Sequence, residues 1–472
     1  MFYDTSKIEF IFDGVRQKWV ELKKETMQLR VVEEKYIRKY LYNHAKEFYI
    51  QNEKKVLYEL PMRDLVFEPF KASSWNKDTI DYQNIFIESE IAFKSRELRN
   101  QTLSNRKKDF GFLDKYKHIK ALLNNILPVE KERNFFLNWI SYIFATKKKT
   151  RTAVVIMGIQ RTGKGVFWEQ IIQYFFGTAY TPTLENEHVK GRFTPTAIEQ
   201  AIFVLCNEVK ADFRDGNNAY ERLKMWISDP YMRIEQKSQN DREAPNFFNM
   251  LFYSNNSVPL QIQGSDGRYS VFKTKSRKLK EVAEEDFKIS IVDFIENIKK
   301  ERDEFLADLV CYDYDEELAT STLETTIKET IYKASMTKIE ILADKIKTLD
   351  EDFFMSELME GAEHLKTDEL ISIVEDTKNI GIYDSYNNLD VKLTLKSIYE
   401  EMKNDLINHA YIKNKSAIFY YKLYISPTEN FTKIGTALNS HLASIPIQKG
   451  VGKVRMIEEF TDANYVKKFI PF

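Results

Sequence analysis

The sequence predicts an α/β fold in which strands of a buried parallel sheet alternate with helices. Three apolar runs have no helical period, at residues 153–157, 201–206 and 246–253, and each ends in polar residues. Such runs are typical of strands buried on both faces of a parallel sheet. Helical patterns over residues 163–176 and 220–228 lie between these runs, as an α/β domain requires.

The turn after the first run has the composition of a phosphate-binding loop. Gly158 is followed after four residues by Gly163 and Lys164. Glycines let backbone N–H groups approach an anion, a helix N-terminus attracts it, and the lysine adds a charge for the β- and γ-phosphates. The alternative is an ordinary strand-to-helix turn with a surface lysine. The residues expected to bind the nucleotide are Gly158, Gln160, Arg161, Thr162, Gly163, Lys164, Gly165 and Val166.

Two positions that usually hold Mg²⁺ beside such a loop are altered. Residue 165 is glycine where a serine or threonine hydroxyl is usual, and Asn207 occupies the place of a metal-binding aspartate. Glu208 follows the second strand, so it is the candidate base that orients the attacking water and, with Asn207, the candidate metal site. Thr162 or water could supply the missing ligand, and Glu208 could instead form a cap or salt bridge at the strand end.

Polar residues also follow the later strands. Asn255 ends the third run, where an amide can sense the γ-phosphate or position the water. Arg268 precedes a further strand and either acts in trans as an arginine finger or pairs with Asp266. A hairpin is expected over residues 231–245, with Lys237 and Arg242 near its tip as DNA contacts, although an ordinary surface hairpin gives the same pattern.

The flanking regions are expected to be mostly helical. Apolar residues recur at roughly helical spacing between charged residues from 15 to 50, so residues 1–127 are predicted to form a helical leader. A helix over 128–145 leads into the core, which extends to 280, and 281–385 is predicted to be helical. Residues 386–472 suggest a winged helix, with a helix at 393–408, a strand-like run at 418–425 and a basic hairpin. Its expected DNA contacts are Lys433, Lys449, Lys453 and Arg455; a protein-binding or structural wing is the alternative.

Composition limits the class of protein. The 472 residues include 70 basic and 71 acidic ones, which argues against a uniformly basic nucleic-acid coat. Cys206 and Cys311 are too few for a disulfide framework or a cysteine-based zinc site. No apolar run is long enough to span a membrane, so we expect a soluble cytoplasmic protein with no membrane partner.

The order of these motifs resembles that of the superfamily 3 helicases of phages, plasmids and large DNA viruses, in particular the phage and poxvirus-type primase-helicases. The matching segments are 158–164 for motif A, Asn207-Glu208 for motif B, 224–237 for motif B-prime, Ser254-Asn255 for motif C and 266–268 for the arginine finger. The departures are Gly165, Asn207 and Gly267, where many relatives carry a second arginine.

This resemblance implies a homohexameric ring on the AAA+ fold, with ATP and Mg²⁺ bound between subunits at a site built by Lys164, Glu208, Asn255 and Arg268. It implies a replicative DNA helicase that translocates on single-stranded and forked DNA and works with a primase or polymerase. An origin-binding or loading ATPase that does not unwind DNA and a nucleotide-binding scaffold with little turnover are the alternatives.

Overall fold

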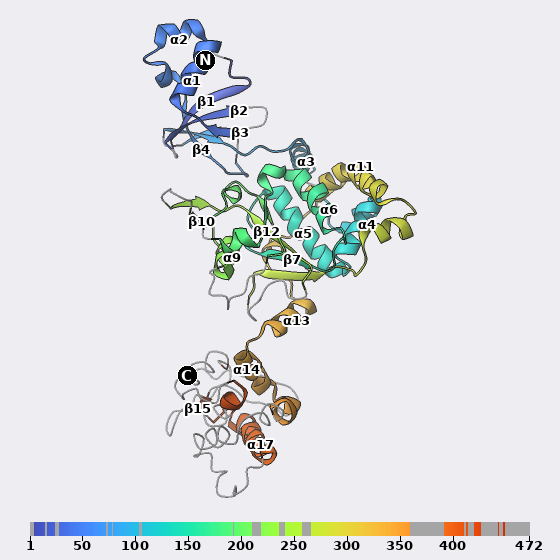
Figure 1. Cartoon of the computed structure of the whole chain (residues 1–472). Coiled ribbons are helices and arrows are strands. Elements are labelled where there is room, and N and C mark those ends of the chain that lie inside the picture. Colours follow the sequence, from blue (N-terminus) through green and yellow to red (C-terminus); the bar gives the residue numbers. More distant parts are fainter. Residues whose placement is uncertain are drawn as a thin grey trace. The chain divides into compact units, whose positions relative to one another are not determined.

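The computed structural model divides the chain into two compact units, residues 1–332 and 333–472 (Figure 1). The structure describes residues 4–14, 17–23, 28–71, 74–77, 79–102, 106–191, 193–209, 219–235, 241–256, 266–358, 391–409, 412–413, 420–425, 442 and 447–448.

A five-stranded sheet with strand order β13-β7-β12-β9-β8 forms the centre of the first unit. Its strands are β7 (Ala153–Met157), β8 (Thr183–Leu184), β9 (Phe203–Asn207), β12 (Asn249–Ser254) and β13 (Tyr269–Lys273). All neighbouring pairs are parallel, which confirms the predicted parallel sheet and brings every carboxyl end to one edge. The short strand β8 was not predicted.

Helices cover both faces of this sheet (Figure 1), which explains why its strands lack an alternation of polar and apolar residues. Val154 and Ile156 of β7 belong to a hydrophobic cluster with α5 (Glu130–Thr146) and α11 (Ile291–Val310). Val155 points to the opposite face and packs in a second cluster with α9 (Ala219–Ser228). The strand that leads to the predicted phosphate-binding loop is therefore anchored from both sides.

The first cluster extends beyond the expected core of 128–280, because it runs from Ala92 of α3 to Ala319 of α12. Phe136, Trp139 and Ile143 of α5 are fully buried in it. The further helical segments of this unit are α3 (Glu90–Gln101), η2 (Phe110–Lys115), α4 (Lys117–Ile126), α6 (Lys164–Phe167), the π-helical η3 (Trp168–Gln173), α7 (Tyr174–Phe176), η4 (Thr178–Tyr180), α8 (Asn186–Lys190), η5 (Thr196–Ile198), α10 (Leu279–Glu281), the π-helical η6 (Val282–Asp286) and α12 (Glu316–Thr320).

The prediction of a mostly helical region over residues 1–127 is wrong for its first part. A six-stranded sheet of order β3-β2-β1-β4-β6-β5 occupies it. The strands are β1 (Ile8–Asp13), β2 (Lys18–Lys23), β3 (Gln28–Val31), β4 (Met62–Val66), β5 (Ser74–Lys77) and β6 (Ile80–Asn84), and the helical segments α1 (Glu34–His44), α2 (Lys46–Asn52) and η1 (Val56–Glu59) lie between β3 and β4.

Buried carboxylates explain this error. Glu9 of β1 and Glu21 of β2 are 2% and 1% exposed, where a strand pattern would show apolar residues. Arg63 lies 3.2 Å from Glu9, and Arg30 lies 2.7 Å from Glu21. Paired charges at inward positions hide the period of two that identifies a strand.

The second unit is described in part. Its elements are α14 (Lys338–Thr348), the π-helical η7 (Phe353–Glu357), α17 (Val391–His409), β14 (Ile412–Lys413) and β15 (Ile447–Gln448), and α13 (Thr326–Ser335) contains the boundary between the units. α17 covers the helix expected at 393–408. Residues 420–424 are helical, so the strand-like run predicted there is wrong. Most of the expected winged helix lies outside the described residues.

Candidate nucleotide-binding site

The turn after β7 has the backbone that a phosphate-binding loop needs. Gly158 and Gly163 have φ angles of +149° and +108°, which side-chain-bearing residues rarely adopt. A Cβ atom on Gly158 would lie 2.0 Å from the Thr274 hydroxyl, and one on Gly163 would lie 2.4 Å from Leu122. Lys164 then begins α6. Both glycines are therefore required by conformation and by space, as the sequence predicts.

Lys164 lies at the centre of this edge of the sheet. Its Nζ donates to the carbonyl oxygens of Gly158 and Ile159 at 2.8 and 3.1 Å and to Asn255 Oδ1 at 3.3 Å. Burial lowers the pKa of this ammonium from its ordinary value, and the charge of Glu208 partly opposes the shift. An anion that entered the loop would stabilise the charged form of the lysine.

Asn255 connects Lys164 to Glu208. Its backbone N and its Nδ2 both donate to Glu208 Oε1, at 3.0 and 2.5 Å, while its Oδ1 accepts from Lys164. These partners fix the orientation of the amide, since the donor must face the carboxylate and the acceptor must face the ammonium. Three residues that the sequence places at three separate strand ends thus form one hydrogen-bonded group.

A cavity of about 770 Å³ adjoins this group. All predicted loop residues except Gly158 line it, together with Asn207, Glu208 and Asn255. The sequence did not indicate the rest of the lining, which is Trp168, Glu169, Gln173, Thr183, Leu205, Tyr253, Leu279, Lys280, Ile291 and Ile295. Leu279 and Ile291 belong to the helical region that follows β13. Apolar residues in a helical pattern are typical of the core, so their pattern does not indicate a binding site. The volume lies within the range of small-molecule sites.

Few of the described residues at this edge of the sheet could hold Mg²⁺. Glu208 supplies a carboxylate at the cavity and Asn207 an exposed amide. Thr162 also lines the cavity; it is fully buried, and its hydroxyl forms no hydrogen bond with the part of the chain that the structure describes. Among the described residues, no group of three or more His, Cys, Asp or Glu side chains could hold a metal. Mg²⁺ commonly uses one or two carboxylates with phosphate oxygens and water, and this donor set fits that arrangement.

Asn125 of α4 contacts the backbone of the predicted loop, and no sequence pattern indicates this contact. Its Nδ2 donates to the carbonyl oxygens of Thr162 and Arg277, at 2.8 and 2.9 Å. The backbone carbonyl of Asn125 accepts from Lys275 N at 2.9 Å, and Leu279 N donates to Arg161 O at 2.8 Å. The segment after β13 is therefore tied to the predicted phosphate-binding loop through α4, a helix that lies before the sheet in the chain.

Arg268 does not join this site within the chain. Because Tyr269 pairs with Ala153, Arg268 lies at the amino edge of the sheet, opposite Lys164. Its Nη1 lies 2.8 Å from Asp266 Oδ1, and its Nε donates to Ser228 Oγ at 3.0 Å. The pairing with Asp266 that the sequence allowed is present.

The expected DNA contacts are described in part. The hairpin is formed by β10 (Tyr231–Ile234) and β11 (Arg242–Pro245), so Arg242 lies in the return strand rather than in the turn. It forms an ion pair with Glu199 at 2.5 Å. Lys237 lies outside the described residues, as do Lys433, Lys449, Lys453 and Arg455.

Comparisons with known proteins found relatives of the region that contains this site and of the fold. Residues 156–269 match a family of unknown function, DUF5906. The chain is 28% identical over 207 residues to a DNA primase-polymerase of Nitratiruptor phage NrS-1. The aligned segment covers 43% of this chain and 26% of that protein. The match therefore spans about a quarter of the length of this phage replication protein.

Solved structures of the NrS-1 C-terminal region extend the likeness to nearly the whole chain. One apo structure has a TM-score of 0.66 at 20% identity and covers 95% of both chains. An apo structure of the A form has a TM-score of 0.64 and covers 93% of this chain and 92% of that one. The chain shares the mixed α/β fold of that region. Within the part that the structure describes, no helix is long and apolar enough to cross a membrane.

Proposed function

We propose that this chain is a replication ATPase that uses ATP to move along single-stranded DNA as a ring and to unwind forked DNA. The observation that carries the proposal is the bridge from Lys164 through Asn255 to Glu208 beside the cavity. A cation for the phosphates and a carboxylate for water, oriented by one amide, are the groups that phosphoryl transfer to water requires. The similarity to a phage primase-polymerase supports a role in DNA replication.

In this proposal each residue has a defined task. The backbone of residues 158–163 and Lys164 bind the β- and γ-phosphates. Glu208 orients the attacking water, and Asn255 positions Glu208 against the γ-phosphate. Glu208 and Asn207 would hold Mg²⁺, which would neutralise phosphate charge when bound. The apolar side chains of Leu279, Ile291 and Ile295 offer a wall against which a base could pack.

The contact with DNA rests on the hairpin and on the resemblance. Lysine contacts to phosphates grip any sequence, which suits a motor, and the grip weakens as salt rises. In our proposal Lys237 makes this contact, while Arg242, already paired with Glu199, has a supporting role. A homohexamer and a primase or polymerase partner belong to the same proposal.

DNA-stimulated ATP hydrolysis and strand displacement on a forked duplex test this function. Glu208→Gln should retain ATP binding and lose hydrolysis by about a hundredfold or more, as expected for removal of a general base. Glu90→Gln, an exposed glutamate on α3, is the matched control. Lys237→Ala should hydrolyse ATP without unwinding. Full hydrolysis in Glu208→Gln would refute the base, and full unwinding in Lys237→Ala would refute the hairpin contact.

A second candidate is an ATPase with little turnover that loads or scaffolds other replication proteins. It is favoured by Gly165 and Asn207, since both leave Mg²⁺ with fewer protein ligands. If the wild-type chain binds ATP and DNA but neither hydrolyses nor unwinds at a measurable rate, this candidate replaces the motor. Hydrolysis without unwinding would favour the loader.

A further inference from the structure

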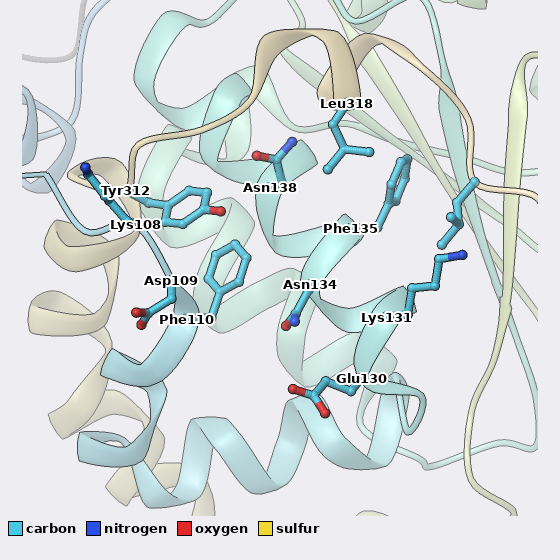
Figure 2. Close-up of a pocket in the computed structure, with 11 residues that line it drawn as sticks. Lys108, Asp109, Phe110, Glu130, Lys131, Asn134, Phe135, Asn138, Tyr312 and Leu318 are labelled. Atoms are coloured by element: carbon cyan, nitrogen blue, oxygen red, sulfur yellow. The ribbon is translucent and has the colours of Figure 1, made fainter.

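A second pocket lies apart from the nucleotide cavity and shares no lining residue with it. Its volume is about 630 Å³, and it lies between the first turns of α5, η2 and α12. Figure 2 shows Phe110 and Tyr312 on one side of it and Phe135 and Leu318 on the other, with Asn134 between them on α5. The proposed function makes no use of this pocket.

The walls of this pocket are fixed by the surrounding structure. The rings of Phe110 and Tyr312 stack at 4.1 Å with an interplanar angle of 24°. Arg99 donates to the Tyr312 carbonyl at 2.6 Å, and Asn138 exchanges two hydrogen bonds with the backbone of Asp315 just before α12. An aromatic surface that is already held in place costs little to order when a ligand binds.

Several polar groups at the pocket are unused. In the part of the chain that the structure describes, the Asn134 amide, the Tyr312 hydroxyl and the ammonium groups of Lys108 and Lys131 form no hydrogen bond or ion pair. Asn138, in contrast, uses its amide oxygen and nitrogen on Asp315. A purely apolar ligand would cover the half-buried Asn134 amide without a partner, which is costly.

Burial raises the pKa of the Tyr312 phenol, so its hydroxyl remains a neutral donor at physiological pH. The charged groups at the pocket are Lys108 and Lys131 on its two sides in Figure 2, Asp109 and Glu130. Asp109 already caps η2 through Gly111 N at 2.8 Å. The Glu130 carboxylate repels a phosphate and can accept a hydrogen bond from an amino group. A phosphate at this pocket would therefore bind beside the ammonium group of Lys108 or Lys131.

We propose that this pocket binds a nucleotide unit, either a free mononucleotide or one residue of single-stranded DNA. The base stacks on the Phe110 and Tyr312 pair, its hydrogen-bonding edge meets the Asn134 amide, and its phosphate meets Lys108 or Lys131. Stacking on aromatic side chains accepts every base, while an asparagine amide can pair with the edge of an adenine. The site thus adds a second place for a nucleotide to the first unit.

The test is made in a Lys164→Ala background, which removes the proposed phosphate grip of the first site. The probes are fluorescent mant-dATP and a fluorescein-labelled thymidine oligonucleotide. The pair Tyr312→Phe with Asn134→Leu keeps the ring and approximate volume but removes the unused polar groups. Affinity for at least one probe should fall by about tenfold. Lys94→Ala, an exposed lysine of α3, is the control and should bind like the background.

The two probes separate the two sources. A loss confined to mant-dATP supports a free nucleotide, and a loss confined to the oligonucleotide supports single-stranded DNA. Unchanged affinity for both overturns the proposal, including the case in which an apolar group of a partner protein fills the pocket. If the double variant fails to fold, Lys108→Ala with Lys131→Ala replaces it, because both side chains are exposed. Where the oligonucleotide loses affinity, crosslinks from a 5-bromodeoxyuridine oligonucleotide must map to Phe110 or Tyr312, and crosslinks only elsewhere overturn the assignment of single-stranded DNA to this pocket. None of these outcomes depends on ATP hydrolysis or unwinding.

Discussion

Gly165 stands where a phosphate-binding loop usually has serine or threonine, and the surrounding structure leaves room for a side chain at this position. A Cβ atom there would meet no atom of the described residues within 4 Å, and its φ angle is not positive. We predict that Gly165→Ser supplies the missing hydroxyl and increases the gain in nucleotide affinity that Mg²⁺ gives by roughly fivefold, about 1 kcal/mol. Fluorescent-nucleotide titrations with Mg²⁺ and with EDTA measure this gain.

Gly165→Ala is the matched control, because it adds the Cβ without the oxygen and should behave like the wild type. Gly163→Ala should abolish binding, since its φ of +108° and the contact with Leu122 exclude a side chain. If serine and alanine at 165 show the same dependence on Mg²⁺, the hydroxyl does not reach the metal and the prediction fails.

The depressed pKa of Lys164 predicts a distinct response to pH. Since burial favours the neutral amine, the free protein loses this charge at a lower pH than an ordinary lysine would. The triphosphate favours the ammonium and raises the pKa again, so binding at alkaline pH should take up protons and weaken as pH rises. Calorimetry at pH 9 in two buffers of different ionisation enthalpy measures the uptake. Lys164→Met should bind the nucleotide weakly and without proton uptake. If this variant takes up as many protons as the wild type, another group binds the proton.

At the scale of elements, α4 is predicted to support the proposed phosphate-binding loop through Asn125. Asn125→Ala leaves the carbonyls of Thr162 and Arg277 without this donor, and we expect a loss of about 2–4 kcal/mol in the free energy of unfolding together with weaker nucleotide binding. Lys120→Ala on the same helix is the exposed control. Denaturant unfolding and nucleotide titration measure the two effects. Lost stability with unchanged affinity would limit Asn125 to a structural role.

The elements also show what the sequence could predict. The strand ends that carry Lys164, Glu208 and Asn255 were predictable, because buried parallel strands are continuous apolar runs and their carboxyl ends share one edge. Asn125 could not be found this way, since its partners lie 37 and 152 residues away. The N-terminal sheet was missed for a related reason: Glu9 becomes compatible with a buried strand only when Arg63 from another strand pairs with it. The periodicity of a short segment does not indicate contacts with residues that are distant in the sequence.

At the scale of the whole molecule, the sheet separates two groups that the proposed reaction needs together. Lys164 and Glu208 lie at the carboxyl edge, while Arg268 precedes β13 at the amino edge. Arg268 cannot reach the phosphates of its own chain without crossing the sheet. If it stabilises the transition state, a neighbouring copy must present it, and each site is then built from two chains.

Mixed assemblies therefore give a sharp prediction. Lys164→Ala and Arg268→Gln should each lack ATPase activity alone, and mixing them should restore part of it, because an intact Lys164 of one chain then meets an intact Arg268 of another. Arg268→Gln is suited to this test, since Asp266 keeps its hydrogen bond from the Tyr220 hydroxyl at 2.9 Å and thermal unfolding can verify the fold. Mixing either variant with itself provides the baseline. If subunit exchange is demonstrated and activity stays at that baseline, Arg268 serves the structure of its own chain through Asp266 and Ser228, and the shared site is excluded.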